Sequence, residues 1–219
     1  MSAILTPDQE RLLSAITAEQ HITSHFYLSG GTALAEYYLH HRLSEDLDFF
    51  SEEEIDIEGL SALIKRVSTK LGVIEVTFEQ SFNRNLFFLR MPHSTVKTEF
   101  TYYPFPRIEK GIQEATLSID SLLDIAVNKL FTISQKPRSR DFIDLFCILQ
   151  KHPEWAVDEL ILKAQAKFDH HIDLLQLSAQ CLKAQELKDY PTMLIPLAEK
   201  EWQDFFVAES KRLAKSQLR

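Results

Sequence analysis

A glycine pair followed by two spaced acids is the feature that constrains this chain most. Gly30-Gly31-Thr32 ends a short β-rich run and opens a helical one, and Asp46-Leu47-Asp48 follows inside the next apolar segment. Alternate side chains of a β-strand share one face about 6.5 to 7 Å apart, so both acids can address one site. Two carboxylates held together in a partly buried place repel each other unless a cation compensates them. The pattern therefore predicts a divalent-metal site on a strand.

Composition limits the partners that this chain can have. Of its 219 residues 45% are hydrophobic and 26% are charged, which allows one domain or two small ones with a sizeable core. The formal net charge of -8 repels polyanions, so a nucleic acid would need a local basic patch. No apolar run approaches the ~18 to 20 residues of a membrane span, and the first residues lack the pattern of a secretion signal. We therefore expect a cytoplasmic protein without a membrane partner.

The periodicity of apolar residues divides the chain into a mixed first half and a helical second half. Pro104 and Pro106 end the last run of strand character and predict a domain boundary, with one domain at 1–115 and the other at 116–219. The expected strands are 25–28, 47–50, 73–78, 86–91 and 95–102, and the expected helices are one from Pro7, then 32–39, 57–71, 121–134, one from 140, 154–168, 172–187 and 196–215. The predicted fold class is α+β: a small mixed β-sheet core with flanking helices, followed by a helical C-terminal region.

Two helix ends carry clear local signals. Thr6, Pro7 and Gln9 have the pattern of a capping box at the start of the first helix. Gly72 stands where a left-handed residue would end the helix expected at 57–71.

A third carboxylate could join the acid pair. On the strand expected at 95–102, Glu99 shares a face with Lys97, and this strand could lie beside the one that carries Asp46 and Asp48. Oxygen ligands suit Mg²⁺, and two such ions can clamp the attacking and leaving oxygens of a phosphoryl transfer. Asp46 and Asp48 would then bind both ions. Glu99 would complete one ion's ligands or help to deprotonate the attacking hydroxyl.

Phosphate-binding candidates flank the acids. Gly30 and Gly31 would let backbone N–H groups approach a triphosphate, and Thr32 would add a hydroxyl at the helix start. Lys129 lies within the apolar stripe of helix 121–134, where a lysine must find an anion or reach solvent. These parts together indicate metal-dependent phosphoryl or nucleotidyl transfer.

The chain resembles the AbiEii/AbiGii-type toxin nucleotidyltransferases of the DNA polymerase β-like superfamily. The superfamily pattern is a glycine turn followed by an acid-apolar-acid strand. The narrower match consists of Gly30-Gly31-Thr32-Ala33-Leu34-Ala35, Leu39-His40-His41-Arg42, Ser44, Asp46-Leu47-Asp48-Phe49-Phe50, and Lys129 followed by Arg140-Asp141-Phe142-Ile143-Asp144-Leu145.

The resemblance implies transfer of a nucleoside monophosphate from an NTP to an acceptor, with two Mg²⁺ ions and with tRNA 3′ ends as the acceptor of some relatives. It also implies a toxin of a toxin–antitoxin or phage-defence system, with a cognate antitoxin as a partner. Lys129 and Asp141 match positions tied to nucleotide binding and activity, and Asp144 supports them. Glu99 departs from the family, in which an Asp is more usual on the corresponding strand.

Other functions remain open at this stage. The acceptor could be a protein hydroxyl or a small molecule, or the chain could be a non-catalytic nucleotide-binding regulatory module. Asp46 and Asp48 could instead flank an exposed edge strand, and Glu99 could be a plain surface residue.

Several single residues also have two interpretations. Lys129 could form a structural ion pair with Asp141 or Asp144, and Arg42 could bind phosphate or pair with Glu45. The adjacent histidines before Arg42 lack the i,i+4 spacing of helical metal ligands. The two cysteines, Cys147 and Cys181, are expected to be buried free thiols.

Overall fold

The computed structural model describes residues 4–217 and divides them into two units. The first unit comprises the residues up to Tyr38, Leu43–Pro106 and Lys110–Ser121. The second comprises Leu39–Arg42, Arg107–Glu109 and the residues from Leu122 on. The functional division into 1–115 and 116–219 stays a prediction.

A mixed sheet organises the first unit. Within residues 4–217 it has seven strands in the order β3-β4-β5-β2-β1-β7-β6. The pairs β2–β5 and β1–β7 are parallel and the other pairs are antiparallel. The strands are β1 Tyr27–Ser29, β2 Asp46–Ser51, β3 Glu75–Ser81, β4 Arg84–Arg90, β5 Thr95–Tyr102, β6 Gln113–Glu114 and β7 Leu117–Ile119.

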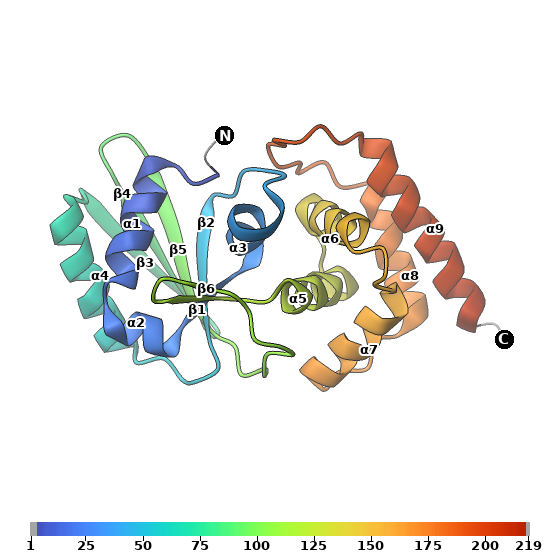
Figure 1. Cartoon of the computed structure of the whole chain (residues 1–219), viewed down its shortest axis with the longest axis horizontal. Helices are drawn as coiled ribbons and strands as arrows, with labels where there is room; N and C mark the ends of the chain where they lie inside the picture. The colour runs from blue at the N-terminus through green and yellow to red at the C-terminus, as the bar shows by residue number, and fades with distance from the viewer. Residues whose placement is uncertain (1–3, 218–219) are drawn as a thin grey trace. The chain divides into compact units, whose positions relative to one another are not determined.

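Helices cover the sheet on both sides. The helices of this unit are α1 Pro7–Thr17, α2 Gln20–His25, α3 Gly30–Leu34, which continues as a π-helix over Ala35–Leu39, and α4 Ile57–Leu71. Figure 1 shows α1 and α4 on one side of the strands and α3 on the other. The helices α1 and α4 enclose the apolar core of the unit, whose members include Leu12, Ile16, Leu28, Leu47, Phe49, Leu60 and Phe100.

Local signals predicted several elements of this unit closely. The strand at 95–102 and the helix at 57–71 have the expected bounds, and Gly72 ends α4 with a φ of 71°. The Thr6 hydroxyl and the Gln9 side chain form the expected reciprocal capping box.

Other expectations for this unit were wrong. His25 ends the short helix α2 rather than starting a strand, so the strand expected at 25–28 is β1 at Tyr27–Ser29, and α3 begins at Gly30 rather than at Thr32. Strands β6 and β7 were not expected at all. They are too short for a periodic signal, and the parallel pairing of β7 with β1 connects this pair of strands to the rest of the sheet.

The second unit is helical, as expected. Trp202, Phe142 and Phe206 lie at its centre, and Phe142 stacks on Trp202 with ring centroids 6.3 Å apart. Its helices are α5 Leu122–Gln135, α6 Ser139–Lys151, α7 Val157–Phe168, α8 Leu174–Leu182 with a 3₁₀ turn at Lys183–Gln185, and α9 Glu199–Gln217. The sheet unit and this helical unit together give the α+β class that the sequence predicts.

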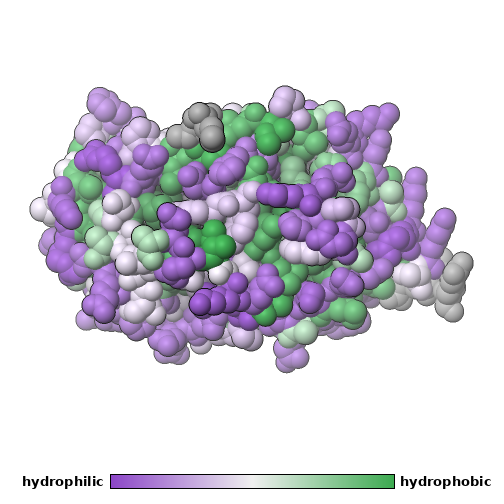
Figure 2. Space-filling view, viewed as in Figure 1, coloured by the Kyte–Doolittle hydropathy of each residue, from purple (hydrophilic) through white to green (hydrophobic). Residues whose placement is uncertain are grey.

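The surface drawn in Figure 2 is mainly hydrophilic, with smaller hydrophobic areas between the polar side chains. Among residues 4–217, no helix combines the length and the apolar composition that crossing a membrane requires.

Candidate active site

The acids of β2 and β5 share one face of the sheet. In the parallel β2–β5 pair, Asp48 is the register partner of Glu99 and Asp46 is the register partner of Lys97. Register partners on neighbouring strands point to the same side, so the three carboxylates project together. The expectation that the Glu99 strand lies beside the Asp46 strand is therefore confirmed, and the edge-strand interpretation of Asp46 and Asp48 is wrong because β2 lies between β5 and β1.

The opposite face explains why the acids point where they do. Leu47, Phe49 and Phe100 are fully buried, and the Phe49 and Phe100 rings stack with centroids 4.9 Å apart. Because side chains alternate along a strand, burying these residues fixes the acids on the other side. A register slip of one residue would bring the carboxylates into the apolar core.

Gly30 lies directly against one of these carboxylates. Its φ is +70°, which favours glycine, and a Cβ added to it would lie 2.5 Å from Oδ2 of Asp48. The turn into α3 can therefore reach Asp48 only with glycine at this position. Gly31 follows in the first turn of α3.

Thr32 ties the start of α3 to the acid-bearing strand. Its side chain is buried, and its hydroxyl contacts the backbone carbonyl of Asp46 and lies 2.8 Å from the hydroxyl of Ser44. In this conformation the hydroxyl is engaged by the protein. Thr32 therefore positions the glycine turn over β2.

Two cations neutralise part of the acid cluster. Arg84 donates from Nε and Nη2 to the two oxygens of Glu99, both at 2.6 Å. Lys97 Nζ lies 2.8 Å from Oδ2 of Asp46 and 4.0 Å from Oε2 of Glu99. Three carboxylates and two cations leave this site, which we call the carboxylate face, with a formal charge of -1.

These contacts shift the ionisation of Glu99 and Arg84. Burial raises the pKa of Glu99, but hydrogen bonds from Arg84 and Thr101 and the nearby positive charges outweigh it, so the pKa lies below its usual value. The hydrogen bonds to Glu99 outweigh burial at Arg84 and raise the pKa of its guanidinium, with further contributions from Asp48 and Asp46. Arg84 thus experiences the field of all three carboxylates. Glu99 is 4% exposed, so the prediction of a plain surface residue is wrong.

The donor chemistry of this face suits Mg²⁺, which prefers carboxylate oxygens. In the conformation described for residues 4–217, however, no three His, Cys, Asp or Glu side chains converge as a metal site. Lys97 and Arg84 contact the oxygens of Asp46 and Glu99 that an ion would use. Asp46 and Asp48 would hold an ion once Lys97 moves aside, and Glu99 could join them only when Arg84 releases it.

The second unit contains a separate buried charge cluster around Asp144. Arg42 donates to Asp144 through Nε at 2.6 Å and Nη2 at 2.8 Å, and His41 Nε2 lies 2.9 Å from Oδ1 of the same carboxylate. Lys129 Nζ lies 2.7 Å from both Asp141 Oδ1 and Asp144 Oδ2. We call these five residues the Asp144 cluster.

The cluster bears on two interpretations that the sequence left open. Lys129 forms the ion pairs with Asp141 and Asp144 that one interpretation expected, whereas Arg42 binds Asp144, an acid not considered for it. The phosphate-binding roles of both residues stay predictions. Burial alone would raise the pKa of Asp144, but Lys129 and Arg42 hold it well below its usual value. Burial alone would lower the pKa of Lys129, but Asp144 and Asp141 raise it instead.

Asp141 also shapes the beginning of α6. Its Oδ2 accepts a hydrogen bond of 3.0 Å from the backbone N–H of Arg138, while Oδ1 binds Lys129. One carboxylate thus caps the helix and fixes the lysine, which explains why an acid is needed in the first turn of this helix.

The chain matches a model of a known protein family. The profile described as "Nucleotidyl transferase AbiEii toxin, Type IV TA system" matches residues 11–213. The chain belongs to the AbiEii toxin family. It is therefore a nucleotidyltransferase by descent, and the family resemblance that the sequence motifs predict is confirmed.

Individual proteins are similar to this AbiEii protein over two thirds of its length or more. An uncharacterized protein of Aquifex aeolicus (strain VF5), aq_aa25, is 34% identical over 149 residues, which cover 67% of this chain and 68% of that protein. JHP933 from Helicobacter pylori is 19% identical with a TM-score of 0.55, covering 95% of this chain and 91% of that one. Another H. pylori structure, of a candidate nucleotidyltransferase, is 20% identical with a TM-score of 0.61, covering 98% and 99%. The two structures support the fold.

The AbiEii motifs thus form two groups of contacts, one in each unit. Gly30, Thr32 and the acids of β2 and β5 meet in the sheet unit, and Arg42 joins Lys129, Asp141 and Asp144 in the helical unit. The roles of these residues in binding and catalysis remain predictions.

The sequence interpretation missed three residues that touch these groups. Arg84 lay between the strands expected at 73–78 and 86–91, and Lys97 was noted only as sharing a face with Glu99. His41 was named only within the family match and as an unsuitable metal ligand. The opposite charges of Lys97 and Glu99 at i,i+2 on one strand face were an available signal. Nothing local in the sequence indicated that His41 would contact Asp144.

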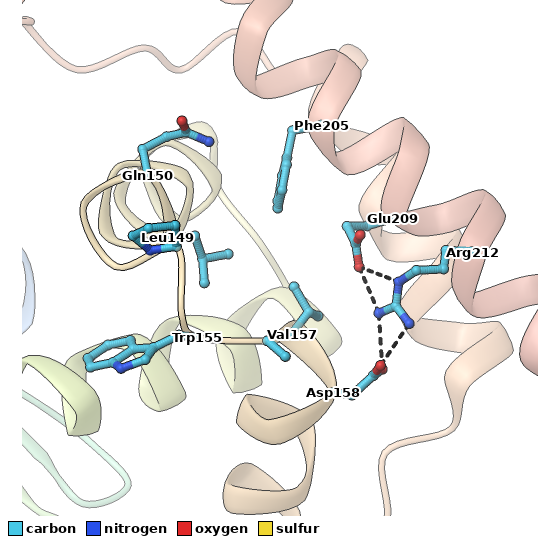
Figure 3. A pocket seen from close by; sticks show the side chains of 10 residues that line it. Leu149, Gln150, Trp155, Val157, Asp158, Phe205, Glu209 and Arg212 are labelled. Carbon is cyan, nitrogen blue, oxygen red and sulfur yellow. Dashed lines mark hydrogen bonds and ion pairs between the residues drawn. The ribbon is translucent and has the colours of Figure 1, made fainter.

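The helical unit also contains a cavity of about 430 Å³ between α6, α7 and α9, which includes none of the predicted site residues (Figure 3). Trp155 and Phe205 supply aromatic surface, and Arg212 is held between Glu209 and Asp158. Both carboxylates satisfy the guanidinium, so the charges at this cavity are already paired.

Proposed function

We propose that this AbiEii-family protein uses Mg²⁺ to transfer a nucleoside monophosphate from an NTP to the 3′-terminal hydroxyl of tRNA. The observation that carries the proposal is the pairing of Asp48 with Glu99 beside the Gly30 turn. It brings acidic ligands and a glycine-rich backbone to one place, as phosphate chemistry with a divalent ion requires.

The reaction is an in-line displacement at the α-phosphorus. The acceptor oxygen forms a bond to this phosphorus while the bond to the bridging oxygen breaks, so that pyrophosphate leaves with the electron pair and the hydroxyl proton goes to water. A bound Mg²⁺ would neutralise phosphate charge and favour the ionised acceptor hydroxyl. Asp46 and Asp48 hold the ions, of which two are expected.

Glu99 is better suited to hold a cation than to accept a proton. Arg84 keeps the pKa of Glu99 below its usual value, and a divalent ion bound in place of Arg84 would likewise favour the ionised carboxylate, which is a weak base near neutral pH. We therefore assign Glu99 to metal binding, after release of Arg84, rather than to deprotonation of the acceptor.

The glycine turn is proposed to bind the triphosphate through backbone N–H groups of Gly30 and Gly31. Thr32, whose hydroxyl contacts the Asp46 carbonyl, keeps this turn at the carboxylate face. A Cβ at Gly30 would collide with Asp48, so the turn can approach this carboxylate closely only because residue 30 is glycine.

Residues of the Asp144 cluster are proposed to serve the same reaction through nucleotide binding. Lys129 and Arg42 carry two positive charges, which Asp141 and Asp144 balance. A phosphate would compete with carboxylates for Lys129, so Asp141 and Asp144 orient this lysine and Arg42 holds Asp144 in place. Lys129 is the member assigned to phosphate.

The biological role proposed for this activity is that of a toxin countered by a cognate antitoxin, because the family profile describes type IV toxin–antitoxin systems. Induced expression of the wild-type chain should arrest growth, and expression of Asp48→Asn should not. Equal growth of the two strains at equal protein levels would contradict the toxin role.

A labelling assay tests the acceptor. Purified protein is incubated with Mg²⁺, total tRNA and each α-labelled NTP in turn, and the products are then divided into samples with and without RNase. Label on tRNA that RNase removes supports the proposal. Label that survives RNase and migrates with a protein would instead indicate a protein acceptor, and nucleotide binding without transfer would indicate a regulatory module.

A further inference from the structure

On the carboxylate face, the guanidinium of Arg84 contacts both oxygens of Glu99 through Nε and Nη2. We propose that Arg84 is a phosphate-binding residue of the transfer site, and that its guanidinium passes from Glu99 to a substrate phosphate when metal and nucleotide bind. This inference rests on the proposed function and adds a residue that the family motifs do not include.

The geometry allows such a transfer. Both guanidinium contacts to Glu99 are 2.6 Å long, and the planar fork that fits a carboxylate fits a phosphate equally well. The side chain of Arg84 is 49% exposed, whereas that of Glu99 is 6% exposed. Arg84 is therefore the partner that can turn away toward solvent.

The charges of the carboxylate face favour movement of Arg84 from Glu99 to a phosphate once a metal ion is bound. Without a ligand, the three acids would repel a polyphosphate, and Arg84 and Lys97 reduce their formal charge to -1. A divalent ion at Asp46 and Asp48 replaces this compensation. The positive charge of Arg84 then becomes available to phosphate oxygens beside the same acids, whose field already reaches it.

A purely structural role explains the contact less well. The ladder between β4 and β5 already pairs every residue from Arg84 to Arg90 with Thr95 to Thr101, so the strands do not need the ion pair to stay in register. Arg90, at the other end of β4, shows what an ordinary surface pair looks like here. It is 51% exposed and binds Glu75, which is 59% exposed.

Arg90 is consequently a matched control for Arg84. Both lie on β4, both have half-exposed side chains and both bind a glutamate. They differ in that Arg84 binds Glu99 and pairs with Thr101, two residues away from it, whereas Arg90 binds Glu75 and pairs with Thr95, four residues from Glu99. The test measures binding of inorganic tripolyphosphate in the presence of Mg²⁺ by calorimetry, and binding of Mn²⁺ alone by electron paramagnetic resonance. The variants are Arg84→Gln, Arg84→Lys and Arg90→Gln, with Asp48→Asn to locate the metal.

We expect Arg84→Gln to weaken tripolyphosphate binding about tenfold, as loss of a charge-assisted fork predicts. The same variant should bind Mn²⁺ as well as or better than the wild type, because Glu99 is released. Arg84→Lys should lie between the two, and Arg90→Gln should match the wild type in both measurements. Thermal unfolding of Arg84→Gln within the range of Arg90→Gln confirms that the fold is intact.

Two results would overturn the assignment. If Arg84→Gln binds tripolyphosphate like the wild type while Asp48→Asn loses Mn²⁺, the metal site stands and the phosphate role of Arg84 is wrong. If the wild type binds neither probe, the proposed function fails and the role of Arg84 fails with it.

Discussion

Arg42 and Asp144 form a two-armed ion pair with contacts of 2.6 and 2.8 Å, and their side chains are 2% and 0% exposed. The same carboxylate also binds Lys129 and His41. Removing one partner of a buried pair leaves the other charge buried without compensation, which typically lowers the free energy of unfolding by about 3 to 5 kcal/mol.

Asp144→Asn should therefore lower the free energy of unfolding by about 3 to 5 kcal/mol, as measured by urea denaturation. Asp158→Asn is the matched control, because Asp158 also binds an arginine through both arms but is 62% exposed. Its effect should be within about 0.5 kcal/mol. Similar losses in the two variants would show that burial of the Arg42–Asp144 pair does not matter.

Acid stability should depend on the same residue. The pKa of Asp144 in the folded chain lies well below its ordinary value of 3.8, so its contribution is complete above that value and is lost as the pH falls through the lower, folded pKa. The free energy of unfolding of the wild type should fall between about pH 5 and pH 2 more steeply than that of Asp144→Asn. Parallel curves would refute this origin of the acid sensitivity.

Gly30 and Gly72 offer a comparison between two left-handed glycines. Their φ values are +70° and +71°, but an added Cβ meets Asp48 Oδ2 at 2.5 Å in the first case and nothing within 4 Å in the second. Gly72→Ala should lose about 1 kcal/mol from backbone strain alone. Gly30→Ala should lose more, by thermal or chemical unfolding, and should also lose transferase activity. Equal stability losses with full activity in both variants would contradict the close packing of the turn on Asp48.

Both cysteines should be poor nucleophiles. Burial raises the pKa of Cys147 to about 11 and that of Cys181 to about 12, so few thiolates exist at pH 8. The native protein should react slowly with a disulfide reagent at this pH, and the denatured protein should react rapidly at both thiols. Cys181 is buried as expected, whereas Cys147 is only partly buried. Fast reaction of either thiol in the native protein would contradict the raised pKa values.

Much of the carboxylate face could be predicted because it depends on a period of two. Alternation along β2 and β5 fixes Leu47, Phe49 and Phe100 in the core, and this alone brings Asp48 and Glu99 to the other side. Helical periodicity, together with Gly72 at the C-terminal end, likewise predicted the bounds of α4.

The contacts of Arg84 could not be predicted, because they depend on the register of a hairpin. Phe82 and Asn83 form the turn without a glycine, and Phe82 has a φ of 51°. The turn signal was therefore weak, and β4 was expected to begin at Leu86 rather than at Arg84. Because the start of β4 was predicted two residues too late, Arg84 was assigned to a loop instead of a strand.

The partner of Arg42 could not be predicted from the sequence for a different reason. Arg42 and Asp144 are 102 residues apart, and charge alone does not select one acid among the 32 in the chain. Glu45 was the nearer candidate in sequence. Only the packing of the helical unit determines that Asp144 receives both arms.

The most direct test of nucleotidyl transfer compares two labels on one NTP. The wild type and Asp48→Asn are each incubated with Mg²⁺, tRNA and the NTP labelled at either the α- or the γ-phosphate. We expect the wild type to move the α-label to tRNA and to leave the γ-label in pyrophosphate, and we expect Asp48→Asn to move neither label. Transfer of the γ-label to the acceptor, or full α-transfer by Asp48→Asn, would contradict the proposed mechanism.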